Sequence, residues 1–142
     1  MTETELIKKA KTARLKAYAP YSKFKVGAAL LTESGKVYTG ANVENSTYGL
    51  TVCAERVAVF KAINDGKEDF VKIVIAADKN PPITPCGACR QVLSEFAHDL
   101  EVVCVNLKGK IDRYKLKELL PEAFENPLMD EKHEKGKKEK GK

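Results

Sequence analysis

The sequence predicts an α/β protein in which helices cover both faces of a mixed sheet. Three observations support this prediction. Two strand-like stretches, 25–32 and 37–43, flank a short polar turn at 33–36 and therefore form an antiparallel hairpin. A continuous apolar run over 71–77 is typical of a strand that is buried on both faces. Helix-like segments alternate with the later strands, which is the order of βαβ crossovers.

The other elements follow from apolar spacing and from the residues that stop helices. Apolar residues three and four apart predict a first helix before the hairpin and a second one after it, which Asn64-Asp65-Gly66 ends. A proline-rich loop, 80–85, leads into a third helix, and a β-type apolar run follows it. The expected bounds are helices over 4–18, 53–64, 86–98 and 114–120 and a strand over 101–106, in the overall order α-β-β-α-β-α-β-α.

Composition fits one globular domain over 1–125 and a charged tail over 126–142 that we expect to be disordered. Of the 142 residues, 43% are hydrophobic and 32% are charged. No apolar run reaches the roughly 18 residues that cross a bilayer, and the first ten residues lack the pattern of a secretory signal. We therefore expect a cytoplasmic protein that has no membrane partner.

The net charge of +5 is modest and partly local, because residues 129–142 hold six lysines and four acidic residues. A lysine-rich tail can contact nucleic acid, but interleaved acids weaken the binding of a polyanion. We expect no nucleic-acid partner.

Three cysteines and one glutamate predict a zinc site. Cys53 and Cys86 lie at predicted helix starts, and Cys89 shares one face of the first turn with Cys86. A catalytic zinc site takes three protein ligands and leaves the fourth position to water. Glu55, two residues after the first cysteine, is then free to move protons.

The arrangement leaves alternatives open. Arg56 and Arg90 can each donate to a thiolate and draw off negative charge, or can be exposed helix residues. The cysteines also fit two other hypotheses: a closed four-ligand zinc site and a thioredoxin-like redox pair. Candidate fourth ligands are poor, because Cys104 sits in a predicted core strand, His98 is nine residues past the last cysteine, and His133 is in the tail.

The segments 53–56 and 85–91 resemble the zinc-dependent cytidine deaminases, whose signature pairs a zinc ligand and a glutamate with a later Pro-Cys-x-x-Cys. The first ligand is a cysteine, which is similar to the small homotetrameric, all-cysteine branch. The segments 18–29, 42–45 and 119–124 resemble further blocks of that family. The resemblance implies a three-layer α/β/α sandwich with a mixed sheet of about five strands.

It also implies hydrolytic deamination of cytidine and deoxycytidine in pyrimidine salvage, with one zinc ion per subunit of a homotetramer. Glu55 is then the catalytic residue, and Arg56 contacts a zinc ligand without binding the metal. By the same resemblance, Tyr48 and Phe124 are expected to reach into a neighbouring subunit's pocket. The implied zinc ligands are Cys53, Cys86 and Cys89, and the implied substrate contacts are Phe24, Asn42, Glu44, Asn45, Tyr48 and Ala54.

The residues themselves support a free nucleoside as substrate. Asn42 and Glu44 are two apart on a predicted strand, so an amide and a carboxylate face the same way and can bind sugar hydroxyls. A bound 3′-hydroxyl cannot carry the phosphate of a polynucleotide. Ser46 and Thr47 depart from the family pattern at the pocket rim. The rivals are a blasticidin-type deaminase, a polynucleotide deaminase and a non-enzymatic zinc-stabilised binding module.

Overall fold

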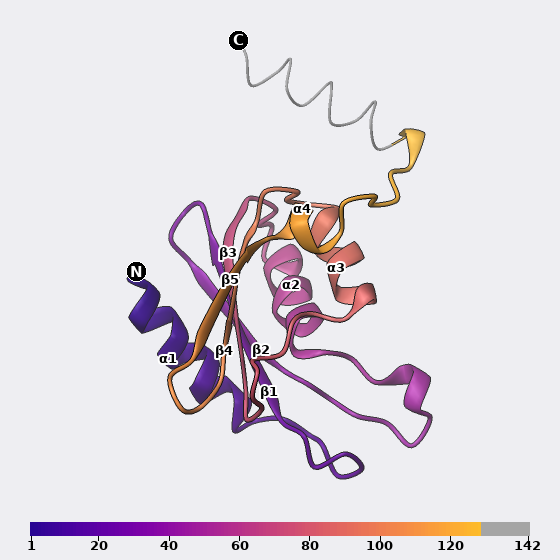
Figure 1. Ribbon diagram of the computed structural model, residues 1–142. Helices are drawn as coiled ribbons and strands as arrows, with labels where there is room; N and C mark the ends of the chain where they lie inside the picture. Colours follow the sequence, from indigo (N-terminus) through magenta and orange to yellow (C-terminus); the bar gives the residue numbers. More distant parts are fainter. Residues whose placement is uncertain (129–142) are drawn as a thin grey trace.

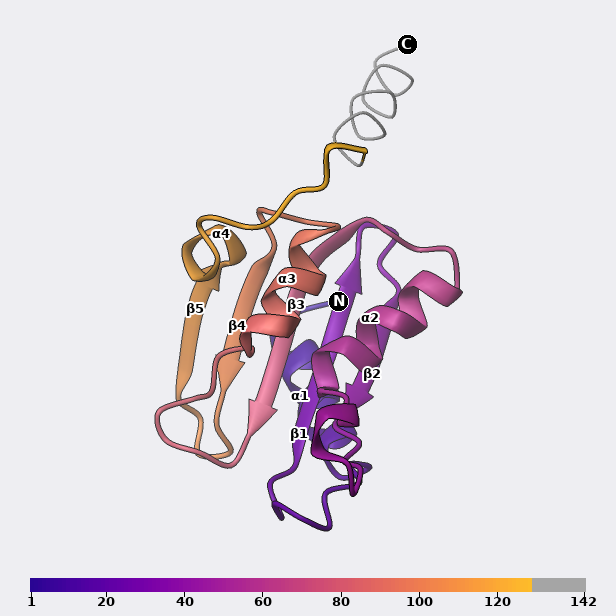
Figure 2. The same ribbon diagram turned by 90° about the vertical axis from the view of Figure 1, so that its right-hand side faces the viewer.

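The computed structural model describes residues 1–128 and has three layers (Figure 1). Helix α1 (Glu3–Arg14) covers one face of a five-stranded sheet, while α2 (Ala54–Asn64) and α3 (Gly87–Ser94) cover the other (Figure 2). The predicted α/β/α sandwich is therefore confirmed. Apart from its first three residues, the predicted tail at 126–142 lies outside the described residues.

The sheet is mixed, and its strand order is β2-β1-β3-β4-β5. β1 is antiparallel to both of its neighbours, β3 and β4 are parallel, and β5 returns antiparallel to β4. The expected hairpin and crossovers are thus present. The strand bounds are Val26–Thr32 for β1, Val37–Ala41 for β2, Phe70–Ala77 for β3, Glu101–Val105 for β4 and Ile111–Lys115 for β5.

The fifth strand and the last helix differ from the sequence prediction. A helix was expected over 114–120, whereas the chain forms β5 and then one helical turn, α4 (Leu116–Leu119). β5 is an edge strand that pairs only with β4, and none of its residues is fully buried. An edge strand of this kind carries little of the apolar alternation by which strands are recognised.

Two apolar clusters cover the opposite faces of β3, as the continuous apolar run predicts. Ile73 and Ile75 face α2 and α3, while Val74 and Ala76 face α1, and all four are fully buried. This two-sided burial makes β3 the centre of the core.

The helices on both faces end earlier than their apolar spacing predicts. α1 ends at Arg14 rather than at 18, and α3 ends at Ser94 rather than at 98. After α1 the chain turns, and the Tyr18 amide donates to the Asn42 carbonyl at 2.9 Å. The residues after Arg14 therefore pair with the chain at the end of β2 instead of continuing the helix. None of the described helices is long and apolar enough to span a bilayer.

Two glycines let helices lie directly on the strands. A Cβ at Gly27 of β1 would come within 2.1 Å of the Ala10 carbonyl oxygen in α1. A Cβ at Gly40 of β2 would come within 2.4 Å of the Ala54 carbonyl oxygen, in the first turn of α2. Gly40 therefore sets the distance between the sheet and the start of α2, where the first motif cysteine lies.

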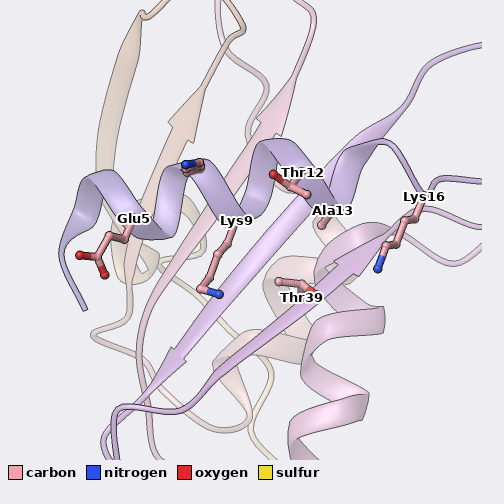
Figure 3. A pocket seen from close by; sticks show the side chains of 7 residues that line it. Glu5, Lys9, Thr12, Ala13, Lys16 and Thr39 are labelled. Carbon is pink, nitrogen blue, oxygen red and sulfur yellow. The ribbon is translucent and has the colours of Figure 1, made fainter.

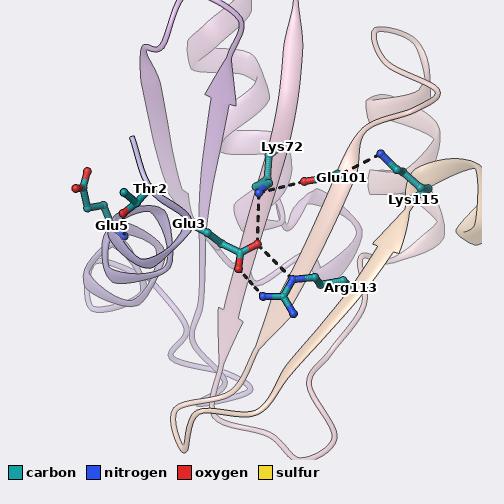
Figure 4. Close-up of polar contacts among 7 residues, drawn as sticks. All are labelled: Thr2, Glu3, Glu5, Lys72, Glu101, Arg113 and Lys115. Atoms are coloured by element: carbon teal, nitrogen blue, oxygen red, sulfur yellow. Dashed lines mark hydrogen bonds and ion pairs between the residues drawn. The ribbon is translucent and has the colours of Figure 1, made fainter.

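An ion-pair network joins the start of α1 to three strands (Figure 4). Glu3 pairs with Arg113 of β5 at 2.5 Å and with Lys72 of β3 at 3.4 Å. Lys72 also pairs with Glu101 of β4 at 3.1 Å, and Lys115 lies 3.8 Å from the same carboxylate. These contacts hold α1 across the sheet on the face opposite α2.

Candidate active site

Three cysteine side chains meet where α2 and α3 begin. Cys53 is the N-cap of α2, Cys86 is the N-cap of α3, and Cys89 lies in the first turn of α3. The Cys86 Sγ atom is 3.7 Å from the Cys53 Sγ atom and 3.4 Å from the Cys89 Sγ atom. Two helix N-termini, whose partial positive charge favours thiolates, therefore bring three sulfur atoms to one point.

The sulfur geometry fits a zinc ion. Tetrahedral zinc with Zn–S bonds of about 2.3 Å requires sulfur atoms about 3.8 Å apart. The three sulfur atoms lie within 4.8 Å of one another, and within the described residues no histidine, carboxylate or further cysteine joins the group. His98 instead pairs with Glu125 at 3.3 Å, and Cys104 is buried in β4. Residues 1–128 thus offer three ligands, one fewer than a closed tetrahedral zinc site needs.

Glu55 lies in the first turn of α2, beside the cysteines, and the residue is 4% exposed. Burial raises the pKa of this carboxyl to about 7, and the neighbouring Cys53 thiolate acts in the same direction. A carboxyl with a pKa near neutral pH can both accept and release a proton, as a general acid and base must.

The pKa values of Cys53 and Cys89 are shifted in opposite directions. A hydrogen bond from Cys89 and the nearby Arg56 guanidinium lower the pKa of Cys53 to about 5, while the same Cys53 contact raises the pKa of Cys89. The Arg56 Nη2 atom lies 3.5 Å from the Cys53 Sγ atom and 3.4 Å from the Thr51 carbonyl oxygen. Its buried Nε atom has no hydrogen-bond partner among residues 1–128. Arg56 thus lies where it offsets thiolate charge.

Arg90 differs from Arg56, although both directly follow motif residues. Its guanidinium donates to the Pro85 carbonyl oxygen at 2.7 Å, the Leu119 carbonyl oxygen at 2.8 Å and the Thr84 hydroxyl at 2.9 Å. It is neither the thiolate donor nor the exposed helix residue that the sequence left open. Arg90 instead ties the loop before Cys86 to the end of α4.

A short extended segment after β2 runs beside the cysteine group. Val43 and Val52 exchange two backbone hydrogen bonds of 2.9 Å, and Val52 directly precedes Cys53. On the other side, the Glu44 amide donates to the Tyr18 carbonyl oxygen at 2.8 Å. Segments that are far apart in the sequence therefore place Asn42 and Glu44 one strand away from the first cysteine.

Asn42 and Glu44 both bind main-chain groups where the chain enters β1. The 9% exposed Asn42 accepts from the Val26 amide and donates to the Phe24 carbonyl oxygen, both at 2.9 Å. The Glu44 carboxylate accepts from the Tyr21 amide at 3.0 Å, and the Ser22 hydroxyl bonded to it lowers its pKa. Each side chain retains a lone pair or N–H that these contacts do not use.

The other predicted substrate residues have different surroundings. Phe24 is partly buried against the core, and Ala54 is fully buried at the first position of α2. The Asn45 side chain accepts from the Thr47 amide at 2.9 Å within the loop that contains the short 3₁₀ turn η1 (Tyr48–Leu50). Tyr48 is 72% exposed, and its ring lies 5.8 Å from that of Tyr21.

Phe124 is also 72% exposed, and its main chain is held by a residue that sequence reasoning missed. The side-chain Nε2 of Gln91 donates to the Phe124 carbonyl oxygen at 2.9 Å, and its Oε1 accepts from the main-chain N–H of Phe124 at 3.3 Å. The C-terminal segment is thereby fixed to α3, two residues beyond Cys89. The position of Gln91 beside the Cys-x-x-Cys motif was the available signal.

A cavity of about 460 Å³ lies between α1 and β2 (Figure 3). It is on the face of the sheet opposite the cysteines, because they begin α2 and α3. It is not the site of the cysteine chemistry. Its lining residues are Glu5, Lys8, Lys9, Thr12, Ala13, Lys16 and Thr39.

Comparison with known proteins agrees with this geometry. Residues 1–106 match the family described as the cytidine and deoxycytidylate deaminase zinc-binding region. A cytidine deaminase from Sporosarcina psychrophila is 51% identical over 125 residues, which cover 87% of this chain and 92% of that protein. A blasticidin-S deaminase from Bacillus cereus is 33% identical over 110 residues, which cover 70% and 76%.

A solved structure gives the same result at the level of the fold. The crystal structure of cytidine deaminase from Burkholderia pseudomallei matches with a TM-score of 0.85 and 52% sequence identity, covering 87% of this chain and 100% of that one. The predicted resemblance is confirmed by both comparisons. The chain belongs to the family of cytidine and deoxycytidylate deaminases that share this zinc-binding region.

Proposed function

We propose that the protein catalyses the hydrolytic deamination of cytidine and deoxycytidine to uridine and deoxyuridine, with release of ammonia. The observation that carries this proposal is a buried carboxyl, that of Glu55, beside three converging cysteines with one tetrahedral position left over. A closed structural site needs a fourth protein ligand, and the described residues place none there. The arrangement therefore favours an enzyme over a zinc-stabilised binding module.

Cys53, Cys86 and Cys89 hold one zinc ion per chain. When bound, zinc supplies Lewis acidity that makes a water molecule a nucleophile at neutral pH. Arg56, through its 3.5 Å contact with the Cys53 sulfur atom, offsets the excess negative charge of three thiolates.

Glu55 moves the protons. It accepts one from the attacking water and delivers it to N3 of cytosine while the water oxygen bonds to C4. It then takes the remaining proton from the hydroxyl group now on C4 and delivers it to the amino group, so that the C4=O bond forms as the C4–N bond breaks and ammonia leaves. Burial supports this role because it keeps the pKa of Glu55 near neutral pH.

The nucleoside lies between the cysteines and the segment after β2. Asn42 and Glu44 bind the sugar hydroxyls, and Phe24 packs against the base. Asn45 contacts the substrate at the pocket rim, and Ala54 contacts it at the start of α2. Support comes from the backbone pairing that brings the 42–44 segment next to the residue before Cys53.

The active unit is a homotetramer in the cytoplasm that serves pyrimidine salvage. Tyr48 and Phe124 of one subunit complete the pocket of another. Their exposure supports this role, because each of the two aromatic residues is 72% exposed in the single chain. Large exposed aromatic residues are enriched at protein–protein interfaces.

A single assay tests the reaction. Purified zinc-loaded protein is incubated with cytidine, and uridine and ammonia are measured with and without a chelator. We expect equal molar amounts of both products, and their loss after metal removal. Blasticidin S and a single-stranded cytosine oligonucleotide are assayed in parallel. Faster deamination of either one would replace cytidine as the proposed substrate, and no turnover of any of the three would contradict the proposed reaction.

A further inference from the structure

The segment that precedes β1 wraps around the Glu44 carboxylate. The Oε1 atom accepts from the amides of Tyr21 and Ser22 at 3.0 and 3.2 Å, and the Oε2 atom accepts from the Ser22 hydroxyl at 2.5 Å. Two successive N–H groups on one carboxylate form an anion nest. The nest is occupied by a side chain of the same protein, so it fixes the direction of that carboxylate.

The Ser22 hydroxyl makes a second contact, on the side of Phe24. It accepts from the Phe24 amide at 3.0 Å while it donates to Glu44. A serine hydroxyl has one donor and two acceptor positions, so both contacts can form at once. Lys23, between the two residues, has a φ of 61°, a left-handed conformation that is uncommon outside glycine. Persistent contacts on both sides are needed to hold such a turn.

Asn42 holds the other main-chain group of Phe24. Its amide donates to the Phe24 carbonyl oxygen at 2.9 Å. The N–H of Phe24 is therefore bound by the Ser22 side chain and its C=O by the Asn42 side chain. The Ser22 hydroxyl is itself hydrogen-bonded to Glu44. Because Asn42 and Glu44 belong to a single extended segment, Phe24 cannot move without disturbing that segment.

We propose that Ser22 is a positioning residue that couples the Glu44 carboxylate to the main chain of Phe24, so that the sugar and base contacts form one hydrogen-bonded unit. This inference rests on the proposed function, which places the sugar on Glu44 and the base on Phe24. Ser22 lies in the family-like segment 18–29, but the sequence alone predicts no role for it. Its role follows from the two contacts of its hydroxyl.

Coupling makes a specific prediction for nucleoside kinetics. In Ser22→Ala, KM for cytidine rises about tenfold, as expected for the loss of a hydrogen bond to a charged group, while kcat stays within about twofold. Ser22→Thr retains the hydroxyl and keeps KM within about threefold of wild type. In a Glu44→Gln background, Ser22→Ala adds less than about threefold, because the contact it breaks is already weakened.

A second readout needs no substrate. Amide hydrogen exchange at Phe24 is measured by NMR on the zinc-loaded protein. Exchange becomes about tenfold faster in Ser22→Ala. It is also faster in Glu44→Gln, although Glu44 does not touch the Phe24 amide. The matched control is Ser34→Ala. The Ser34 hydroxyl lies in the β1–β2 turn, 3.0 Å from the Thr32 hydroxyl, and its removal should leave KM and Phe24 exchange unchanged.

The outcomes separate the two proposals. An unchanged Phe24 exchange rate in Glu44→Gln, or a full tenfold rise of KM on adding Ser22→Ala to Glu44→Gln, would show that the two contacts are independent and would overturn the coupling. Failure of the wild-type protein to form uridine would instead overturn the proposed reaction. The exchange measurement would still decide whether Ser22 couples Glu44 to Phe24.

Discussion

Both faces of the sheet carry an apolar cluster, but the polar contacts on the two faces differ in kind. On the α1 face, apolar residues such as Leu6 and Val74 pack together, and an ion-pair network fixes the helix start at Glu3. On the cysteine face, irregular segments are held by side chains that bind main-chain groups, among them Asn42 and Arg90. Both faces therefore contribute to stability, while the second face also sets the geometry of the reacting groups.

The largest expected effects lie on the cysteine face, where two substitutions separate proton transfer from metal binding. Glu55→Gln should lower kcat by three or more orders of magnitude, about the upper range for acid–base catalysis, and should retain zinc because Glu55 is not among the sulfur ligands. Cys86→Ala should lose both zinc and activity. Zinc per chain by atomic absorption and turnover of cytidine measure the two effects.

Each half of this prediction can fail separately. Near-normal turnover in Glu55→Gln would remove Glu55 from the mechanism. Stoichiometric zinc in Cys86→Ala would point to a ligand set other than the three converging cysteines.

The glycine pair Gly27 and Gly40 compares the two faces directly. An alanine Cβ would lie 2.1 Å from a main-chain atom of α1 in Gly27→Ala and 2.4 Å from one of α2 in Gly40→Ala. Backbone cannot move aside as a flexible side chain can, so each change should lower the free energy of unfolding by about 3 kcal/mol. Only Gly40→Ala displaces the start of α2, so only it should also lower zinc affinity.

Chemical denaturation and zinc titration of both glycine variants provide the test. Equal loss of zinc affinity in Gly27→Ala and Gly40→Ala would mean that the two faces are not separable. The proposed division between stability and site geometry would then be wrong.

Local sequence patterns predicted the parts of this fold that depend on neighbouring residues. Apolar spacing and the proline-rich loop placed Cys53 and Cys86 at helix starts, and the apolar run identified β3. β5 was missed because its pairing with β4 depends on a distant segment and its own residues are only partly buried. Tertiary pairing of this kind leaves little trace in the strand itself.

The surroundings of polar side chains were harder to predict than the cysteine group. Nothing near Arg90 in the sequence distinguishes an acceptor on Leu119, 29 residues away, from an acceptor on a thiolate. The same holds for Asn42, whose side chain binds the main chain 16 and 18 residues earlier. A hydrogen bond between remote segments depends on the completed fold, whereas helix and strand patterns depend on local spacing.

The arginine pair tests whether contacts on the cysteine face act on charge or on geometry. Arg56→Gln removes the guanidinium that lies 3.5 Å from the Cys53 sulfur atom, so kcat or zinc affinity should fall about tenfold, as for other groups that bond metal ligands. Arg90→Gln removes three hydrogen bonds to oxygen atoms and should lower the free energy of unfolding by about 3 kcal/mol. Kinetics and denaturation on both variants measure this. A larger loss of stability in Arg56→Gln than in Arg90→Gln would contradict it.

The smallest effect is expected on the α1 face, at Glu3. Its partner Arg113 lowers the pKa of Glu3 from the ordinary value of 4.5, so the ionised carboxylate stabilises the fold. Glu3→Gln should therefore cost about 1 kcal/mol or less at neutral pH, since the pairs are partly exposed and screened by salt. That difference is fully present above the unfolded pKa and should shrink as the pH falls below about 4.5, through the lower folded pKa, because the wild-type carboxylate then also becomes neutral. Thermal unfolding of both proteins between pH 6 and pH 3 measures this, and cytidine turnover should be the same in both, because the network lies on the face away from the cysteines.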